Sequence, residues 1–124
     1  MKKFLFTALA LFSANISFAD THVCNLTSPE GSSYRISFKF NEGERREQVL
    51  VTIYLNNKVQ ISHLNSVKVD SDSHGDGWGM TLKDPNHRQY KYDINFEAQY
   101  VSSAYVTMPG LKNYPVDSCR RLKN

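Results

Sequence analysis

The densest group of side chains able to do chemistry lies in the loop over residues 70–77. Its potential metal ligands are Asp70, Asp72, His74 and Asp76, with glycines at positions 75 and 77. Calcium prefers several oxygen ligands on a flexible turn of this kind. An EF-hand-type loop, however, needs Asp or Asn at position 74 and a bidentate Glu at position 81, where the chain has Thr. A polar hairpin loop explains the same residues, so we expect neither a metal nor another cofactor.

Four histidines could serve as transition-metal ligands or as acids and bases. They are His22, His63, His74 and His87. None of them forms the close His-x-His or His-x₃-His spacing that directs two imidazoles at one ion from a single element. His87 falls in a predicted turn and His63 at a predicted strand end. The pattern favours surface and turn histidines, with zinc at His74 and Asp72 or Asp76 as the alternative.

Nucleophilic catalysis has little support in this sequence. The two cysteines, Cys24 and Cys119, are better explained as a disulfide, and the chain contains no Gly-x-Ser-x-Gly string. Ser102 and Ser103 lie on a predicted strand, where they fit a polar sheet face. We therefore do not expect an enzyme.

Aromatic side chains are the remaining candidates for recognition. Strand alternation places Tyr34, Tyr90 and Tyr92 inward, whereas Tyr54 and Tyr105 face outward. Exposed tyrosines provide a large contact area at a low cost in rotamer entropy. Trp78 follows Gly-Asp-Gly and belongs either to a loop mouth or to the core. The candidate binding face is therefore Tyr54, Trp78 and Tyr105, with ordinary cross-strand packing as the alternative.

The first residues have the pattern of a secretory signal peptide. Lys2 and Lys3 precede an apolar stretch over 4–12, and Ser17-Phe18-Ala19 forms a small-x-small cleavage site. We expect a signal over residues 1–19 and one secreted or periplasmic domain over 20–124, without a membrane anchor. Two cysteines that reach an oxidising compartment pair by default, which predicts a Cys24–Cys119 disulfide.

The charge of the predicted mature chain is nearly balanced. Removal of Lys2 and Lys3 leaves 13 Lys and Arg against 12 Asp and Glu, a net charge of +1. Nucleic-acid binding requires a clustered cationic face. The charge therefore argues against a nucleic-acid partner.

The elements that must position these residues are β-strands, because the apolar period is two almost throughout. Alternation is clear over 34–40, 49–55, 78–82, 90–96 and 100–108, with shorter runs at 59–61 and 67–69. Asn56-Asn57 suits a two-residue hairpin turn, and Asp84-Pro85-Asn86-His87 suits a type I turn.

This pattern predicts an all-β fold, a single antiparallel barrel or sandwich of seven to eight short strands. The cysteine-bearing segments 22–28 and 114–120 are predicted to lie side by side. They would join the first and last strands, with Cα atoms of the two cysteines within about 7 Å.

This layout is similar to that of periplasmic lysozyme inhibitors of the membrane-bound or C-type family. The shared features are an all-β secreted domain, a cysteine in the first strand and a second in the segment Pro-Val-Asp-Ser-Cys-Arg-Arg-Leu. The resemblance implies a small barrel closed by an end-to-end disulfide, with a Ser-Gly-x-x-Tyr loop that enters the lysozyme cleft. That string is absent here, and Ser102-Ser103-Ala104-Tyr105 is the nearest to it. The resemblance therefore assigns no inhibitory residue.

We expect from the sequence an exported binding module that recognises a protein partner. The alternatives are a barrel carrier of a small apolar ligand, a lysozyme-inhibitor-like protein or a small hydrolase. A barrel of this size can fill its interior with side chains or keep a cavity. The sequence leaves the oligomeric state open.

Overall fold

The computed structural model describes residues 21–40, 48–69, 77–97 and 100–122. Nine strands lie in these ranges, and all neighbours in the sheet are antiparallel. The strands are β3 (Thr21–Thr27), β4 (Ser33–Phe40), β5 (Gln48–Leu55), β6 (Lys58–Val69), β7 (Gly77–Lys83), β8 (Lys91–Glu97), β9 (Tyr100–Met108), β10 (Leu111–Pro115) and β11 (Ser118–Leu122).

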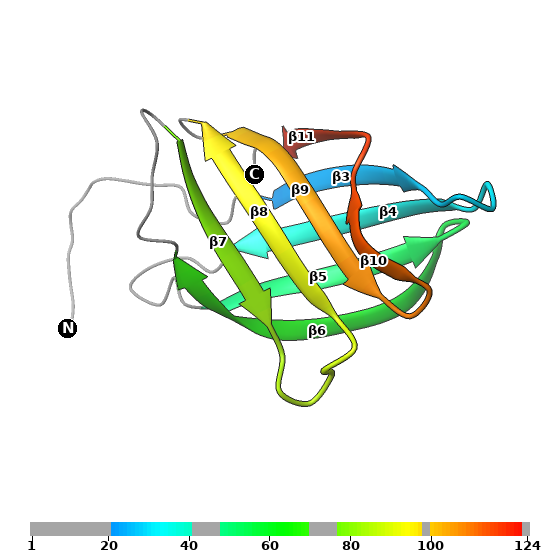
Figure 1. The fold of residues 1–124 in the computed structure, drawn as a ribbon, viewed down its shortest axis with the longest axis horizontal. Coiled ribbons are helices and arrows are strands. Elements are labelled where there is room, and N and C mark those ends of the chain that lie inside the picture. The colour runs from blue at the N-terminus through cyan, green and yellow to red at the C-terminus, as the bar shows by residue number, and fades with distance from the viewer. Residues whose placement is uncertain (1–20, 41–47, 70–76, 98–99, 123–124) are drawn as a thin grey trace.

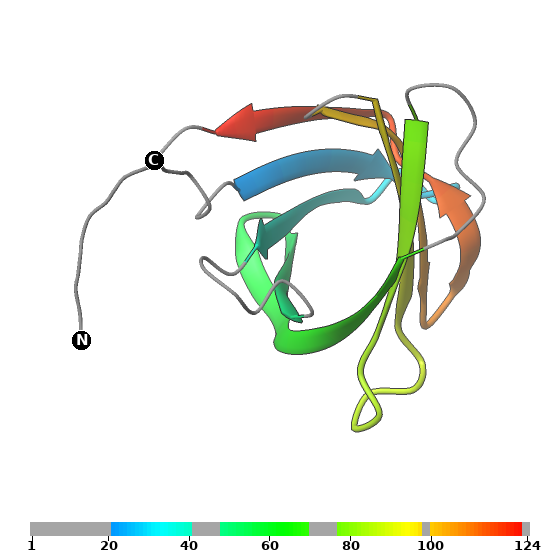
Figure 2. The same cartoon turned by 90° about the vertical axis from the view of Figure 1, so that its left-hand side faces the viewer.

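The nine strands form one sheet that curls into a half-barrel (Figures 1 and 2). Strands β3 to β10 follow one another in chain order, and β11 returns to pair with β3. Between β10 and β11, the Val116 amide donates to the Ala104 carbonyl at 3.0 Å, and the Asp117 amide donates to the Asn25 carbonyl at 2.7 Å. One chain segment therefore bonds to both β9 and β3 and links the two margins of the sheet.

The predicted disulfide is confirmed. Cys24 and Cys119 are register partners on β3 and β11, their sulfur atoms are bonded, and their Cα atoms lie 4.0 Å apart. The cysteine-bearing segments therefore lie side by side, as the sequence predicts.

The predicted count of seven to eight strands is wrong, because the described residues alone form nine strands. The runs at 59–61 and 67–69 belong to one strand, β6, in which His63 and Asn65 occupy inward positions. These polar residues hide the alternation in the sequence. The C-terminal segment, in contrast, divides into β10 and β11, because the chain switches partner from β9 to β3 at residues 116–117.

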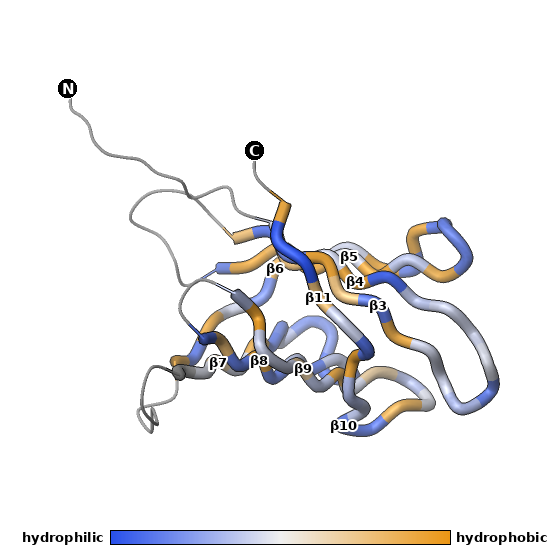
Figure 3. The backbone as a smooth tube through the Cα atoms, turned by 90° about the horizontal axis from the view of Figure 1, so that it is seen from above, coloured by the Kyte–Doolittle hydropathy of each residue, from blue (hydrophilic) through white to orange (hydrophobic). Residues whose placement is uncertain are grey.

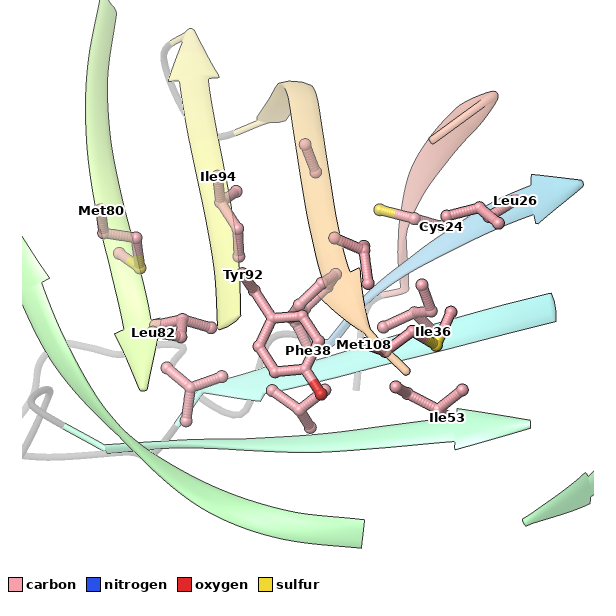
Figure 4. Close-up of a cluster of buried hydrophobic side chains, with 14 of the residues drawn as sticks. Cys24, Leu26, Ile36, Phe38, Ile53, Met80, Leu82, Tyr92, Ile94 and Met108 are labelled. Atoms are coloured by element: carbon pink, nitrogen blue, oxygen red, sulfur yellow. The ribbon is translucent and has the colours of Figure 1, made fainter. Parts of the chain in front are cut away.

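The concave face of the sheet carries the hydrophobic core. Side chains from the wall that contains β4 and β5 meet side chains from the wall that contains β8 and β9. Phe38 on β4 packs edge-to-face on Tyr92 of β8, with ring centroids 5.7 Å apart (Figure 4). Apolar and polar residues alternate along the strands (Figure 3), because successive side chains point to opposite faces. The largest apolar side chains that are fully buried are Tyr92, Phe38, Leu26, Ile36, Ile53, Leu82 and Ile94.

Candidate functional site

The residues predicted as a binding face lie on different walls of the half-barrel. Tyr54 is on β5, whereas Tyr105 is on β9, four positions away in the sheet order. Tyr105 is 39% exposed and its Cα pairs with Asp93 and Pro115. Trp78 lies in β7 opposite Phe96. The strand order therefore separates Tyr54 from Tyr105, and each belongs to its own outer surface.

Tyr54 acquires a partner that the sequence alone does not indicate. Arg35, its register partner on β4, places its guanidinium carbon 4.3 Å from the centroid of the Tyr54 ring. Arg35 Nη1 also donates to Asn57 Oδ1 at 3.4 Å, at the tip of the β5–β6 hairpin. A guanidinium over an aromatic face is attracted by the ring quadrupole. The arginine is therefore held flat against the outer surface of the sheet.

The surrounding surface, which we call the β4–β6 outer face, consists of the outward residues of these three strands. Thr52 and Ser62 form a cross-strand hydroxyl pair with oxygens 2.9 Å apart. Leu64, which is 46% exposed, pairs with the half-buried Leu50, and Val59 beside Tyr54 is 57% exposed. Apolar side chains thus lie on both sides of a polar stripe.

The charged residues within strands β3 to β6 all have one sign. Within the residue ranges given above, strands β3 to β6 contain four cationic side chains and no Asp or Glu. The four are Arg35, Lys39, Lys58 and Lys68. Five carboxylates do occur among the described residues, but they lie elsewhere, at Glu30, Asp84, Asp93, Glu97 and Asp117. The charges described on the β4–β6 outer face are therefore all positive.

A second site lies on the inward side of β6, where two imidazoles converge on one carboxylate oxygen. His63 Nδ1 lies 3.0 Å from Asp84 Oδ2, and His87 Nδ1 lies 2.7 Å from the same oxygen. Asp84 and His87 belong to the turn between β7 and β8, whereas His63 reaches them from β6. Both His63 and Asp84 are buried, but the His87 side chain is 44% exposed.

The local turn fixes the Asp84 carboxylate and its charge. The Asn86 amide donates to Asp84 Oδ1 at 3.0 Å, and the His87 amide donates to the Asp84 carbonyl at 2.9 Å. The Asn86 hydrogen bond, together with those of His87 and His63, lowers the Asp84 pKa to about 2, against the opposing effect of burial. Asp84 is therefore an anion and accepts hydrogen bonds through both oxygens.

His63 is neutral near pH 7 despite its contact with this anion. Burial lowers its pKa below the usual 6.5 and outweighs the opposing hydrogen bond and charge of Asp84. A neutral imidazole has one donor and one acceptor nitrogen. Because Asp84 can only accept, Nδ1–H donates to it and Nε2 accepts from the Tyr92 hydroxyl at 2.8 Å. The Asp84–His63–Tyr92 contacts thus form a hydrogen-bonded chain.

The Asp84–His63–Tyr92 hydrogen bonds have the order carboxylate, imidazole, hydroxyl. The Tyr92 hydroxyl at their end does not serve as a nucleophile. Tyr92 is fully buried, and burial raises its pKa far above the usual range. A nucleophile must reach its substrate and lose its proton readily, and this phenol does neither. The described residues of the cluster instead connect β6, β8 and the β7–β8 turn.

The sequence interpretation of His63 as a surface residue at a strand end is wrong. It lies inside a twelve-residue strand and is 4% exposed. His22, also expected at the surface, is 4% exposed and packs edge-to-face on Phe40 and Phe96. His63 and His87 meet only because β6 pairs with β7, which brings the following turn beside β6. No short motif could reveal that encounter.

The predicted metal candidates Asp70, Asp72, His74 and Asp76 lie outside the described residues. Within the described part, His63, Asp84 and His87 form a group with ligand atoms within 4.8 Å of one another. Among the same residues, no helix has the length and apolar character needed to cross a membrane.

Comparisons with known proteins leave the geometry as the basis for a functional interpretation. No family model, curated protein sequence or solved structure matches this chain.

Proposed function

We propose that this protein is an exported binding module that recognises a protein partner through its β4–β6 outer face. The observation that carries the proposal is the Arg35 guanidinium carbon 4.3 Å from the centroid of the Tyr54 ring, on strands whose described charged side chains are all cationic. The partner should present carboxylates next to an apolar contact area. The disulfide in so small a domain is compatible with export.

Arg35 is suited to recognise a carboxylate on a partner. Its planar fork can donate two parallel hydrogen bonds to one carboxylate. Its contacts with Tyr54 and Asn57 already restrict the side chain, so binding loses less rotamer entropy than it would for a free arginine. Tyr54, Leu50 and Leu64 supply apolar area beside it. Tyrosine and arginine are, with tryptophan, the residues enriched at the energetic centres of interfaces.

The filled concave face supports a protein ligand over a small apolar ligand. Large side chains from both walls, including Phe38, Leu82, Tyr92 and Ile94, form one buried cluster there (Figure 4). A carrier needs a cavity lined by such residues rather than a core filled by them. The described interior therefore favours recognition on the outside of the sheet.

Charge also distinguishes between the candidate binding partners of the β4–β6 outer face. A second copy placed face to face would bring cation against cation, which is repulsive. Anionic membranes attract clusters of about four to eight basic residues, whereas the cations here are spaced singly among Ser, Thr and apolar side chains. An acidic protein surface satisfies both the charge and the apolar area.

The proposal is tested by comparing two surface variants for capture of a partner from the extracytoplasmic fraction of the source cells. The Arg35→Glu/Tyr54→Ser variant disrupts the β4–β6 outer face, and Tyr105→Ser is the matched control on the other wall. We expect wild type and control to capture the same stoichiometric protein. We expect the double variant to lose it, and capture to fall with added salt because the charges are exposed.

Equal capture by the two variants, or capture of no protein by the wild type, would contradict the proposal. Binding to anionic vesicles that requires Arg35 would replace the protein partner with a membrane. Lysozyme belongs in the same binding assay, because inhibition that depends on Tyr105 rather than Arg35 would support the family resemblance instead.

A further inference from the structure

We propose that His63, Asp84 and His87 form a binding site for a divalent transition-metal ion of the zinc type. The three residues come from β6 and the β7–β8 turn, and each offers a ligand atom that lies within 4.8 Å of the other two. Asp84 Oδ2 contacts Nδ1 of both His63 and His87. Two imidazoles and one carboxylate are an established ligand set for zinc. This site is independent of the β4–β6 outer face.

The distances between the ligand atoms are close to those that zinc requires. Zinc bonds to nitrogen and oxygen of about 2.0–2.2 Å in a tetrahedron place neighbouring ligand atoms about 3.4 Å apart. Asp84 Oδ2 lies 3.0 Å from His63 Nδ1 and 2.7 Å from His87 Nδ1. An ion therefore needs these two contacts to open by about 0.4 Å and 0.7 Å, and the ligand atoms of the two imidazoles, which lie within 4.8 Å of each other, to come to about 3.4 Å. The exposed His87 ring has the freedom to supply that movement.

Two of the three ligands are already fixed by other contacts. The Asn86 amide holds the second Asp84 oxygen, which leaves Oδ2 directed at the two imidazoles. The His63 ring is buried, and its Nε2 lies 2.8 Å from the Tyr92 hydroxyl. Little conformational entropy therefore remains to be lost at these positions when an ion binds.

The Tyr92 hydroxyl provides the outer contact that metal-binding histidines usually have. It lies 2.8 Å from His63 Nε2, the ring nitrogen that faces away from Asp84. Such contacts orient the imidazole and select its tautomer. With a metal on Nδ1, the His63 proton moves to Nε2 and donates to the Tyr92 oxygen. The phenol stays protonated and its hydrogen turns away.

The partly exposed His87 side chain gives an ion access to the buried ligands. Three protein ligands also leave the fourth tetrahedral position for water or an external group. The site would bind an ion at the surface while attaching the β7–β8 turn to β6.

The test is calorimetric titration of the chelator-treated protein with Zn²⁺, in wild type and two histidine variants. His87→Asn retains a hydrogen-bond donor for the turn but removes the imidazole ligand. His74→Asn is the matched control in the other sequence candidate. We expect one ion per wild-type and control chain, with affinity reduced at least about tenfold in His87→Asn. Zinc should raise the thermal midpoint of the wild type and of His74→Asn, but not that of His87→Asn.

The absence of zinc binding to the wild type would overturn the proposal. Loss of affinity in His74→Asn with full affinity in His87→Asn would also overturn it and assign the ion to the 70–76 loop. Circular dichroism of the metal-free variants checks that both are folded. Because His87 is exposed, its replacement should leave the spectrum unchanged.

Discussion

Asp84 shows how much of this molecule depends on one buried anion. Its carboxylate accepts hydrogen bonds from the Asn86 amide, from His63 and from His87, and its pKa falls to about 2. His63, in contrast, is kept neutral by burial. Both groups bind a proton less readily in the folded chain than in the unfolded chain, so acid should destabilise the fold through both.

We expect the metal-free protein to lose stability in two pH windows. A group with a lowered folded pKa contributes stability above its unfolded pKa, and that contribution is lost as pH falls toward the folded value. For His63 the loss begins near pH 6.5, and for Asp84 it runs from about 3.8 down to about 2. Urea unfolding at a series of pH values measures both contributions.

Asp84→Asn isolates the carboxylate contribution. At pH 7 the variant should be less stable by about 1–3 kcal/mol, because a buried imidazole donor loses its anionic partner. The difference from wild type should shrink between pH 4 and pH 2. A constant difference across that range would show that the carboxylate charge is not the cause.

At the scale of elements, the alternation of apolar and polar residues predicted the strands, but it did not predict which residues of neighbouring strands contact one another. The pattern over 34–40 and 49–55 predicted β4 and β5, and it placed Tyr54 on an outer face. It could not predict that Arg35 is the register partner of Tyr54, since that depends on the hairpin alignment. The inward polar residues His63 and Asn65 also concealed the length of β6.

The hairpin between β5 and β6 sets this alignment. Asn56 and Asn57 have φ values of 52° and 68°, as a two-residue type I′ turn requires. We expect Asn56→Val to lower the free energy of unfolding by about 1–2 kcal/mol, since a branched side chain is strained at positive φ. Asn56→Gly, which relieves the strain, is the control and should preserve stability. Equal urea midpoints for the two variants would argue against the strained turn.

At the scale of the whole molecule, one chain crossing links the two margins of the curled sheet, and one disulfide fastens β11 to its neighbour β3. Cys24 and Cys119 are 95 residues apart in sequence, and the segment between β10 and β11 bonds to both β9 and β3. The sequence predicted the disulfide because two cysteines in an exported chain have a single pairing. The change of partner at residues 116–117 has no local signature, which is why the strand count was too low.

Removal of the disulfide should have a large effect on stability. In the chain-entropy model, a loop of this length contributes about 4–5 kcal/mol, a large share of the roughly 5–15 kcal/mol typical of a small domain. We expect the Cys24→Ser/Cys119→Ser protein to unfold at a much lower urea concentration than the oxidised wild type. Reduced wild type is the control and should match the variant. A loss below about 1 kcal/mol would contradict this prediction and show that the pairing of β11 with β3 does not depend on the bond.

Recognition through the β4–β6 outer face is the central claim, and site-specific photo-crosslinking tests it most directly. A photoreactive residue replaces the exposed Ser62 in the middle of this face, or Tyr105 on the other wall. In the native surroundings of the protein, position 62 should give one crosslinked protein partner. That product should disappear when Arg35→Glu is added. A partner crosslinked from position 105 and not from 62, or one insensitive to Arg35→Glu, would contradict the claim.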